Sequence, residues 1–249
     1  MTNSIVGKVA LVTGGAGGIG SAICRRLASE GMSVVITYSR SKDKAEQLAH
    51  ELDGDNHLVI QAPVDDSIAQ IKLAQAIQAQ YGTLDILVNN AGITKPVAHH
   101  DLDTLTDDLI DDIFRVNVRG TLASIRAMKA LLMAEDGGLV INISSIAART
   151  AVGSNVAYCA SKAALDNITM SLARALAPKI RVVSISPGWT NGEYAQRMPP
   201  EIIQEQRDLT PLNRIAEADD TANAVFAVAT QLTFTTGAII PIDGGRPLT

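Results

Sequence analysis

The N-terminal part of the sequence carries a glycine-rich turn between a short apolar run and a helical segment. Residues 9–12, Val-Ala-Leu-Val, are apolar throughout and predict a buried strand. The glycine-rich turn spans residues 13–20, and a helix is expected from Ser21 to about Glu30, with Gly31 as its end. A strand, a tight turn and a helix in this order present the N–H groups of a helix start to a phosphate. This feature predicts an α/β fold that binds a nucleotide.

The remainder of the chain continues the same alternation of short apolar runs and helical stretches. We find no proline- or serine-rich linker, no charge block and no internal repeat, and an apolar fraction of 47% is ample for a core. The expectation is therefore an α/β protein with one domain over residues 1–249. Its architecture would be a Rossmann-like, doubly wound parallel sheet with helices on both faces.

A tyrosine and a lysine, Tyr158 and Lys162, stand four residues apart, and Ser145 precedes the tyrosine by thirteen residues. Positions i and i+4 of a helix share one face, so both side chains can point into one pocket. A phenol loses its proton near a pKa of about 10, and a neighbouring ammonium lowers that pKa. A serine hydroxyl can bond the oxygen of a carbonyl or an alcohol. The spacing predicts a proton relay, although such a pair by itself is usually a half-buried aromatic beside a solvated charge.

The glycines of the turn fit two patterns. The general G-x-G-x-x-G is formed by Gly15, Gly17 and Gly20. The alternative T-G-x-x-x-G-x-G is formed by Thr13, Gly14, Gly18 and Gly20. Further motifs follow in order: Asn89-Asn90-Ala91-Gly92, Asn117 in Val-Asn-Val-Arg-Gly, the run 141–145 that ends in Ser145, Pro187-Gly188, Thr236-Gly237 and Asp243-Gly244-Gly245. Taken together, these motifs resemble the short-chain dehydrogenase/reductase family over essentially the whole chain.

The resemblance implies a catalytic tetrad of Asn117, Ser145, Tyr158 and Lys162. In that scheme Tyr158 is the general acid in reduction and the base in oxidation, and Ser145 holds the substrate oxygen. Lys162 lowers the tyrosine pKa and bonds the nicotinamide ribose, while Asn117 holds a water that links the lysine to solvent. Ser144 competes for the serine role, but the thirteen-residue offset favours Ser145.

The resemblance also implies which residues bind the cofactor. They are Thr13, Gly14, Gly18, Ile19, Gly20, Tyr38, Ser39, Arg40, Val64, Asn90, Ala91, Gly92, Tyr158, Lys162, Pro187, Gly188 and Thr190. Two departures from the family pattern affect this set. Pro63 replaces an aspartate near the adenine, so an amino contact is lost unless Asp65 substitutes. Gly192 stands where a threonine often contacts the carboxamide, and Thr190 comes earlier.

The end of the second strand bears on the choice between NAD(H) and NADP(H). NAD enzymes place a carboxylate there to bind the ribose hydroxyl, but this chain has Tyr38, followed by Ser39-Arg40-Ser41-Lys42. The two basic residues and two hydroxyls would suit a 2′-phosphate, which favours NADP(H) over NAD(H). Against this preference, Gly17 stands where the family often has a basic residue. The same residues could simply begin the next helix, with Ser41 as its N-cap.

The substrate pocket is expected to contain Ser145, Asn155 and Trp189, the only tryptophan. Trp189 is equally well read as a core residue. A lid over the cleft is expected at about residues 191–208. The acidic cluster between Asp101 and Asp112 is read as a solvated helix start rather than a metal site, and no metal is expected. The four histidines show no ligand spacing, and His99 and His100 are at most rim residues.

The net charge of −5 argues against nucleic acid and gives no reason to expect an anionic membrane surface. Cys24 and Cys159 are read as buried free thiols in a reducing compartment. No signal peptide and no apolar run of transmembrane length is present, so cytoplasm is the expected location. The family resemblance implies a homotetramer.

The expected activity is hydride transfer between a nicotinamide cofactor and a carbonyl or alcohol substrate. Within the family, residues 210–214 and the C-terminal tail look most like bacterial 3-oxoacyl-(acyl-carrier-protein) reductases, which would make the substrate an acyl thioester. Glu135 and Asp136 stand where such enzymes offer basic residues to their acidic carrier, and only Lys179 remains near a second docking position. Small ketones, sugars or polyols are the alternative substrates. A non-catalytic nucleotide sensor on the same scaffold is the alternative of another class.

Overall fold

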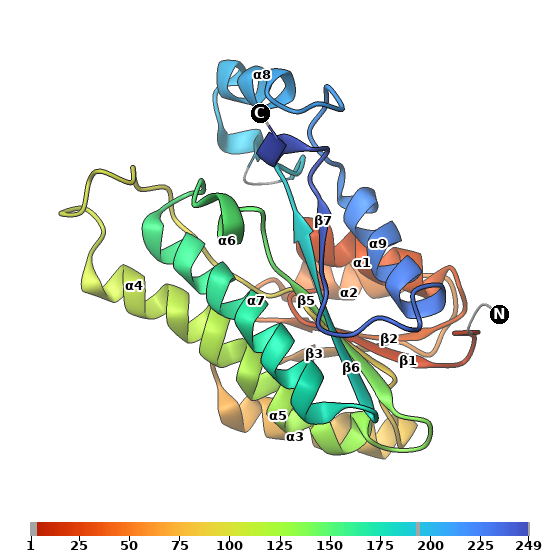
Figure 1. The fold of residues 1–249 in the computed structure, drawn as a ribbon. Helices are drawn as coiled ribbons and strands as arrows, with labels where there is room; N and C mark the ends of the chain where they lie inside the picture. Colours follow the sequence, from red (N-terminus) through yellow and green to blue (C-terminus); the bar gives the residue numbers. More distant parts are fainter. Residues whose placement is uncertain (1–3, 193–194, 249) are drawn as a thin grey trace.

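The computed structural model describes residues 4–192 and 195–248, and these form a three-layer α/β structure (Figure 1). Seven parallel strands make one sheet, in the order β3-β2-β1-β4-β5-β6-β7. Their bounds are β1 Val9–Val12, β2 Ser33–Tyr38, β3 Leu58–Gln61, β4 Ile86–Asn89, β5 Gly138–Ile143, β6 Ile180–Pro187 and β7 Ile239–Ile242. The predicted doubly wound sheet is confirmed.

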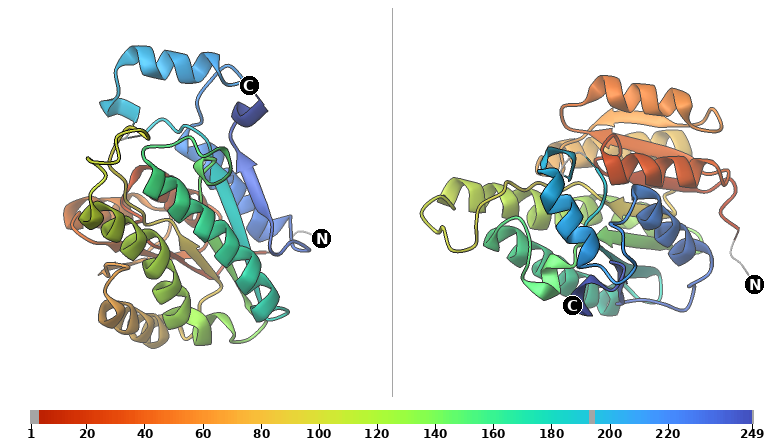
Figure 2. Two further views of the ribbon diagram at one scale, coloured as in Figure 1. Left: turned by 60° about the vertical axis from the view of Figure 1, so that its left-hand side comes forward. Right: turned by 90° about the horizontal axis from the view of Figure 1, so that it is seen from above.

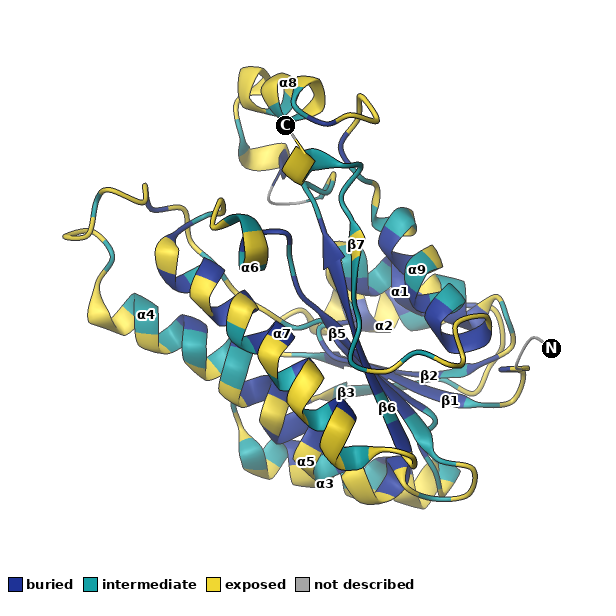
Figure 3. Cartoon of the chain, in the orientation of Figure 1, coloured by how far each residue is buried: buried dark blue, intermediate teal, exposed yellow. Residues whose placement is uncertain are grey.

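Helices cover both faces of the sheet because successive strand residues point to opposite sides. The first layer contains α1 Gly18–Ala28, α2 Lys42–Glu51 and α9 Ala218–Thr230. The second contains α3 Ser67–Tyr81, α5 Thr121–Leu132 and α7 Val156–Leu176. In β1, Ala10 and Val12 pack toward α1, whereas Val9 and Leu11 pack toward α3 and α5. Figure 3 shows the inner strands of the sheet as largely buried, whereas the edge strands β3 and β7 are partly exposed.

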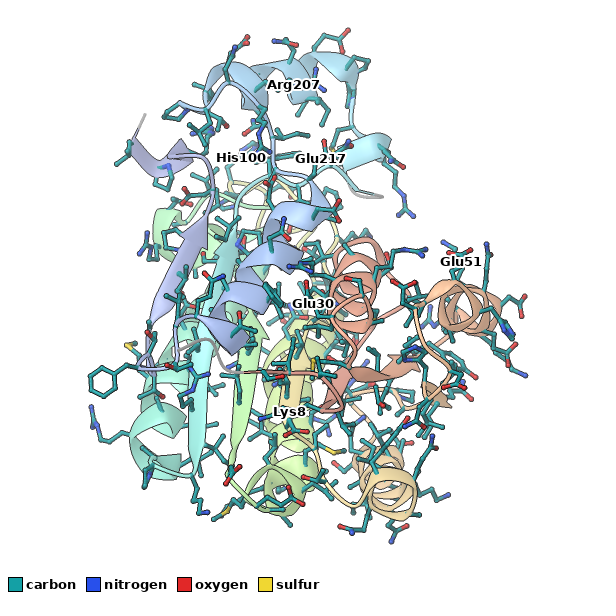
Figure 4. The ribbon with its side chains drawn as sticks, turned by 90° about the vertical axis from the view of Figure 1, so that its right-hand side faces the viewer. Lys8, Glu30, Glu51, His100, Arg207 and Glu217 are labelled. Carbon is teal, nitrogen blue, oxygen red and sulfur yellow. The ribbon has the colours of Figure 1, made fainter. Side chains whose placement is uncertain are left out.

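The expected first helix begins earlier than predicted. It starts at Gly18, inside the glycine turn, and ends at Ala28 rather than near Glu30. Arg25 of this helix forms an ion pair with Glu51 at the end of α2, which ties the two helices together across the outer surface (Figure 4). The glycine turn therefore passes directly into helix, with no ordinary loop between them.

Three shorter helices lie outside the two layers. They are α4 Asp107–Phe114, α6 Ala147–Thr150 and α8 Pro200–Asp208. The Thr106 side chain caps α4 by accepting from Leu109 N, and α4 continues through a π-helical turn, Arg115–Gly120, into α5. Helix α8 stands at one end of the molecule near the C-terminus and buries none of its residues (Figures 1 and 2). It lies within the expected lid, of which Glu193 and Tyr194 are outside the described residues.

The direction of the strands fixes where a site can form. The chain leaves β1 toward β2 on one side and enters β4 on the other, so a crevice opens at the carboxyl ends of these two strands. The glycine turn follows β1, Asn90 follows β4 and Ser144 follows β5. All the motifs named above that follow a strand therefore converge on one edge of the sheet.

Candidate active site

A cleft of about 860 Å³ lies at the carboxyl ends of the strands. Its lining includes the glycine turn at Gly17 to Gly20 and, from other elements, Ser145, Tyr158 and Lys162. Residues 187–192 line it as well, including Trp189. The cleft thus brings together the nucleotide motif and the tyrosine–lysine pair, which lie far apart in the sequence.

The glycine turn is held closed by the segment after β4. Gly14 has a φ of +61°, which favours glycine. The Thr13 hydroxyl accepts from Asn90 N at 3.0 Å and Ala91 N at 3.1 Å, and the Asn90 amide donates to the Thr13 and Gly14 carbonyls. A Cβ on Gly20 would lie 2.5 Å from the Gly14 carbonyl oxygen, so only glycine fits there. Thr13 is fully buried, which gives it a supporting position rather than a place on the cleft surface.

The start of α1 faces the cleft and is well suited to an anion. Gly17 occupies the N-cap without a side-chain hydrogen bond, and Gly18 has open space where a side chain would stand. Because the first N–H groups of a helix have no partner within the helix, they are available to a ligand. Gly17, Gly18, Ile19 and Gly20 all line the cleft.

The end of β2 presents the residues expected to discriminate the cofactors. Ser39 and Arg40 are exposed, and the Ser39 carbonyl accepts from the Gln61 side chain at 2.9 Å. Lys42 pairs with Glu46 at 3.4 Å along the outer face of α2. Ser41 occupies the N-cap position of α2 but makes no side-chain cap hydrogen bond. Of the two basic residues Arg40 and Lys42, Lys42 is therefore engaged in an ion pair within α2 and Arg40 is not.

The segment after β3 places Val64 and Asp65 beside the π-helical turn. Val64 packs so closely that a Cβ on Gly120 would lie 2.7 Å from it. The Asp65 carboxylate accepts from Arg115 Nε at 3.2 Å, and its carbonyl accepts from Arg119 at 3.2 Å. The carboxylate that was considered as a substitute adenine contact is thus engaged with a guanidinium.

Helix α7 presents Tyr158 and Lys162 on one face, as the four-residue spacing requires. The ammonium lies 5.7 Å from the centre of the Tyr158 ring and donates to the Ile143 carbonyl at 2.8 Å, at the end of β5. Ser145 follows that strand end, and its hydroxyl oxygen accepts from Ala147 N at 3.2 Å. Ser144 is only 4% exposed and donates to the Lys162 carbonyl. The more accessible position of Ser145 favours it over Ser144 as a substrate anchor.

Asn117 lies in the π-helical turn and is 1% exposed. Its side-chain oxygen accepts from Ile93 N at 2.8 Å, and its amide donates to the Ile93 carbonyl and to Ser161, both at 3.1 Å. A Cβ on Gly92 would lie 3.3 Å from the Asn117 oxygen and 3.7 Å from the Lys162 nitrogen. Asn117 and Lys162 therefore both lie next to Gly92, and the π-helical turn is a geometry often found at functional sites.

Burial controls the charge state of Lys162, which is 5% exposed. Desolvation lowers the pKa of its ammonium from 10.5 to about 8, and Asp166, one helical turn further along α7, partly opposes this effect. Burial raises the pKa of Asp166 itself, although the Ser184 hydroxyl bonds its carboxylate at 3.0 Å. The cleft thus contains a lysine able to exchange a proton close to neutral pH.

The structure places Asn155 away from the cleft. It is 1% exposed and forms the N-cap of α7, with its side-chain oxygen accepting from Tyr158 N at 2.7 Å. Its amide donates to the Lys95 carbonyl at 2.8 Å. Asn155 therefore does not face the cleft as the expected substrate contact would, because its side chain already bonds Tyr158 N and the Lys95 carbonyl.

Segment 187–192 forms the wall near the expected nicotinamide site. Pro187, Gly188, Trp189 and Thr190 line the cleft together with Gly192. Thr190 forms a bridge with Ala216, and its hydroxyl donates to the Gly188 carbonyl at 3.2 Å. The placement of Trp189 agrees with a pocket wall.

Two basic side chains of the cleft, Arg149 and Arg246, were not singled out as site residues from the sequence. Arg149 stands four residues after Ser145, a spacing that could have singled it out. Arg246 comes from the C-terminal 3₁₀ turn Arg246–Leu248 and bonds Gln206 of α8 at 3.4 Å. No local pattern announces a contact between residues so far apart in the chain.

Over residues 4–192 and 195–248, no three His, Cys, Asp or Glu side chains converge as metal ligands would. Within the same residues no helix has both the length and the apolar character to span a bilayer.

Known proteins resemble this chain along nearly its full length. A family model described as enoyl-(acyl carrier protein) reductase matches residues 14–246. A ketoacyl reductase of the granaticin polyketide synthase of Streptomyces violaceoruber is 34% identical over 249 residues, covering 99% of each chain. A 3-oxoacyl-(acyl-carrier-protein) reductase of Staphylococcus aureus is 33% identical over 242 residues, covering 96% of this chain and 97% of its own.

The solved structure of a short-chain dehydrogenase/reductase from Serratia marcescens has the same fold. It superimposes with a TM-score of 0.90 at 35% identity, covering 98% of this chain and all of that one. The order of the strands, the cleft at their carboxyl ends and the full-length matches agree with one another. This chain belongs to the short-chain dehydrogenase/reductase family of oxidoreductases.

Proposed function

We propose that this enzyme interconverts a carbonyl compound and its alcohol with a nicotinamide cofactor, using Asn117, Ser145, Tyr158 and Lys162. One observation carries the proposal: Tyr158, Lys162 and Ser145 line the same cleft as the glycine turn. A nucleotide site and an acid–base group in one cleft are the two parts that such a reaction requires.

The residues of the cleft fit a dinucleotide. The uncapped start of α1 and the open space at Gly18 suit a pyrophosphate. Gly92, Pro187, Gly188 and Thr190 would hold the nicotinamide half, with Asn90 and Ala91 keeping the turn closed. Tyr38, Ser39 and Val64 would contact the adenosine half. The bound cofactor would supply the hydride and accept it in the reverse direction.

The protein side chains would manage the proton. Ser145 would bond the substrate oxygen, and Tyr158 would give that oxygen a proton in reduction or take it in oxidation. The positive charge of Lys162 favours the phenolate form of Tyr158. Asn117 fixes the wall at Ile93 through two hydrogen bonds and bonds Ser161 of α7 through a third. A lysine with a pKa of about 8 can pass a proton toward solvent near neutral pH.

NADP(H) is the proposed cofactor in preference to NAD(H). The end of β2 has no carboxylate to bond a ribose hydroxyl, and Arg40 is exposed there. An arginine can bind a 2′-phosphate through a charge-assisted contact, whereas a carboxylate would repel it.

A 3-oxoacyl thioester is one proposed substrate class, supported by the two ketoacyl reductase relatives. The expected carrier-docking residues lie elsewhere. Glu135 and Asp136 precede β5 and Lys179 precedes β6, so all three lie at the amino ends of strands whose carboxyl ends bear the cleft. Lys179 also donates to the Glu135 carbonyl at 3.0 Å. Within one chain this arrangement supports a small thioester or a free ketone, sugar or polyol over a carrier-bound substrate.

We also propose that the protein is a homotetramer in the cytoplasm and that residues 191–208 act as a lid. Exposed apolar side chains on and just after α5 and on α7, namely Leu122, Met133, Val156 and Met170, support an interface there. The two cysteines are buried free thiols, which suits a reducing compartment. Light scattering of the purified protein would test the assembly.

The substitution Tyr158→Phe tests the catalytic assignment. It keeps the ring and removes the transferable proton, so turnover of any accepted carbonyl should fall by about 10² to 10⁴ while cofactor affinity stays the same. The oxidation of NADPH and NADH would be followed by absorbance against a carbonyl panel that includes acetoacetyl thioesters. Wild-type turnover in the variant would refute the assignment, and cofactor binding without any turnover in the wild type would favour a nucleotide sensor.

A further inference from the structure

The cleft has a charge that differs in sign from that of the whole chain. The protein has 21 Lys and Arg residues against 26 Asp and Glu residues, for a net charge of −5. Among the described residues that line the cleft, the charged ones are Arg149, Lys162 and Arg246, and none is a carboxylate. A cleft with low-dielectric walls concentrates such a field and attracts anions. The cofactor accounts for one anionic partner, at the glycine turn, but Arg149 and Arg246 come from other elements.

Arg149 follows Ser145 closely in the chain and lines the same cleft. It lies on α6, a short helix that begins just after Ser145, and the Arg149 and Thr150 amides both bond the Ile146 carbonyl at 3.0 Å. The Ser145 carbonyl accepts from Ala148 N at 3.0 Å, so the chain turns tightly between Ser145 and Arg149. A molecule held at the Ser145 hydroxyl would therefore share the cleft with the Arg149 guanidinium.

The Arg149 guanidinium is available for a ligand. Its residue is exposed, and no carboxylate in residues 4–192 or 195–248 forms an ion pair with it within 4.0 Å. Asp166 is near enough for the charge of Arg149 to lower its pKa somewhat, against the larger effect of burial. The Asp166 carboxylate is 7% exposed and already accepts from the Ser184 hydroxyl at 3.0 Å. Asp166 therefore offsets part of the positive charge without occupying the guanidinium.

We propose that the substrate end of the cleft binds a carbonyl compound that carries a carboxylate, with Arg149 as the side chain that binds this acid group. The inference rests on the proposed function, because it names the substrate class of the same site. The planar fork of a guanidinium matches the two oxygens of a carboxylate. The substrate is then a short oxo acid, or its hydroxy acid in the reverse direction, with the acid group a few bonds from the reacting carbon.

Arg246 reinforces this anion site from the opposite end of the chain. Its guanidinium bonds the Gln206 side chain of α8 at 3.4 Å, so the positive charge is positioned by the segment proposed as a lid. The acid group would meet Arg149 first, because Arg149 is only four residues from Ser145. Arg246 would raise the potential of the cleft without being required for orientation.

Matched pairs of acid and ester test the proposal. The wild-type enzyme would be assayed on acetoacetate and levulinate and on the methyl ester of each, at low and high salt. The acid of at least one pair should have a kcat/KM roughly 10- to 100-fold above that of its ester, the size expected of one charge-assisted contact. Added salt should reduce this ratio. Equal kcat/KM values within both pairs would overturn the proposal while leaving the reductase assignment intact.

Variants then locate the contact. Arg149→Gln should remove the preference for the acid and leave the kcat/KM of the ester unchanged, and Arg149→Lys should retain part of the preference. Lys72→Gln is the matched control, because it removes one positive charge from the exposed face of α3. An acid preference that survives in Arg149→Gln, or that falls equally in the control, would contradict the role of Arg149.

Binding can be measured without turnover. Trp189 is the only tryptophan of the chain and lines the same cleft, so its fluorescence can be titrated with levulinate and with methyl levulinate in the presence of NADP⁺. Saturable quenching by the acid that weakens at least 10-fold in Arg149→Gln would support the anion site even if no carbonyl were reduced. Equal responses to acid and ester would overturn it.

Discussion

Replacing Lys162 by methionine should abolish activity without weakening the fold at neutral pH. Lys162 is 5% exposed, and burial lowers its pKa from 10.5 to about 8. At about 1.4 kcal/mol for each pH unit, keeping the ammonium charged inside the fold costs about 3 kcal/mol of unfolding free energy. Methionine removes this cost and fills a similar volume. It also leaves the Ile143 carbonyl without its donor, which costs about 1–3 kcal/mol.

The unfolding free energies of the wild type and of Lys162→Met should depend differently on pH. The folded pKa of Lys162 lies below the unfolded one, so the unfolded chain holds more protons between about pH 8 and 10.5. The unfolding free energy contributed by this group therefore rises with pH through that window, and its penalty is fully present below pH 8. The unfolding free energy of Lys162→Met should lack this rise with pH. At pH 7 the variant should be between equally stable and about 2 kcal/mol more stable, and by pH 10.5 it should have lost about 3 kcal/mol relative to the wild type.

Urea unfolding of the cofactor-free protein from pH 7 to 10.5, followed by fluorescence at one protein concentration, would measure the difference. Titrating groups that do not interact with Lys162 cancel when the variant is subtracted from the wild type. Lys72→Met serves as the control, because Lys72 is exposed on α3 and should show no such window. Parallel stability curves for wild type and Lys162→Met would refute the inference that a buried ammonium titrates in this range.

Three further outcomes are expected. Arg40→Ala should weaken NADPH binding about 10- to 100-fold, as loss of one charge-assisted contact implies, with NADH binding unchanged in calorimetry; equal losses would make Arg40 a structural residue. Asn155→Ala should lower the free energy of unfolding by about 2–3 kcal/mol, because it removes the α7 cap and the partner of the Lys95 carbonyl; a raised KM at unchanged stability would restore it as a substrate contact. Acetoacetyl-pantetheine should be reduced at least as efficiently as the carrier-bound form, with little effect of salt on either, and a many-fold, salt-sensitive preference for the carrier would place the docking face elsewhere.

The fold was largely predictable because its strands are short apolar runs between clear turn signals. β1 and β2 begin and end where the sequence predicts. β5 begins at Gly138, before the run 141–145 on which the sequence analysis relied, although Gly138 resembles a turn by composition. In the structure a Cβ at Gly138 would lie 2.8 Å from Leu132, so the glycine is there to allow close packing. Composition does not separate these two uses of glycine, and only tertiary contacts do.

For the polar residues of the site as well, tertiary contacts rather than local sequence decide the role of each side chain. Asn155 has the chemistry of a substrate contact, and its spacing from Tyr158 places it near the cleft. Its hydrogen bonds nevertheless go to Tyr158 N and the Lys95 carbonyl. The Lys95 carbonyl belongs to a segment far away in the sequence, so no local pattern reveals that the amide is already used.

Arg149 is the opposite case. Its sequence context, the first turn after β5, resembles an ordinary helix start, and an exposed arginine there would pass as a solvated charge. In the fold the same turn places it in the lining of the cleft, together with Ser145 and without a carboxylate of the described chain in ion-pair contact. The two residues therefore differ in one respect. The fold uses the side-chain hydrogen bonds of Asn155, whereas no ion pair within the described residues occupies the guanidinium of Arg149. On that criterion we infer that Arg149, rather than Asn155, contacts the substrate in the cleft.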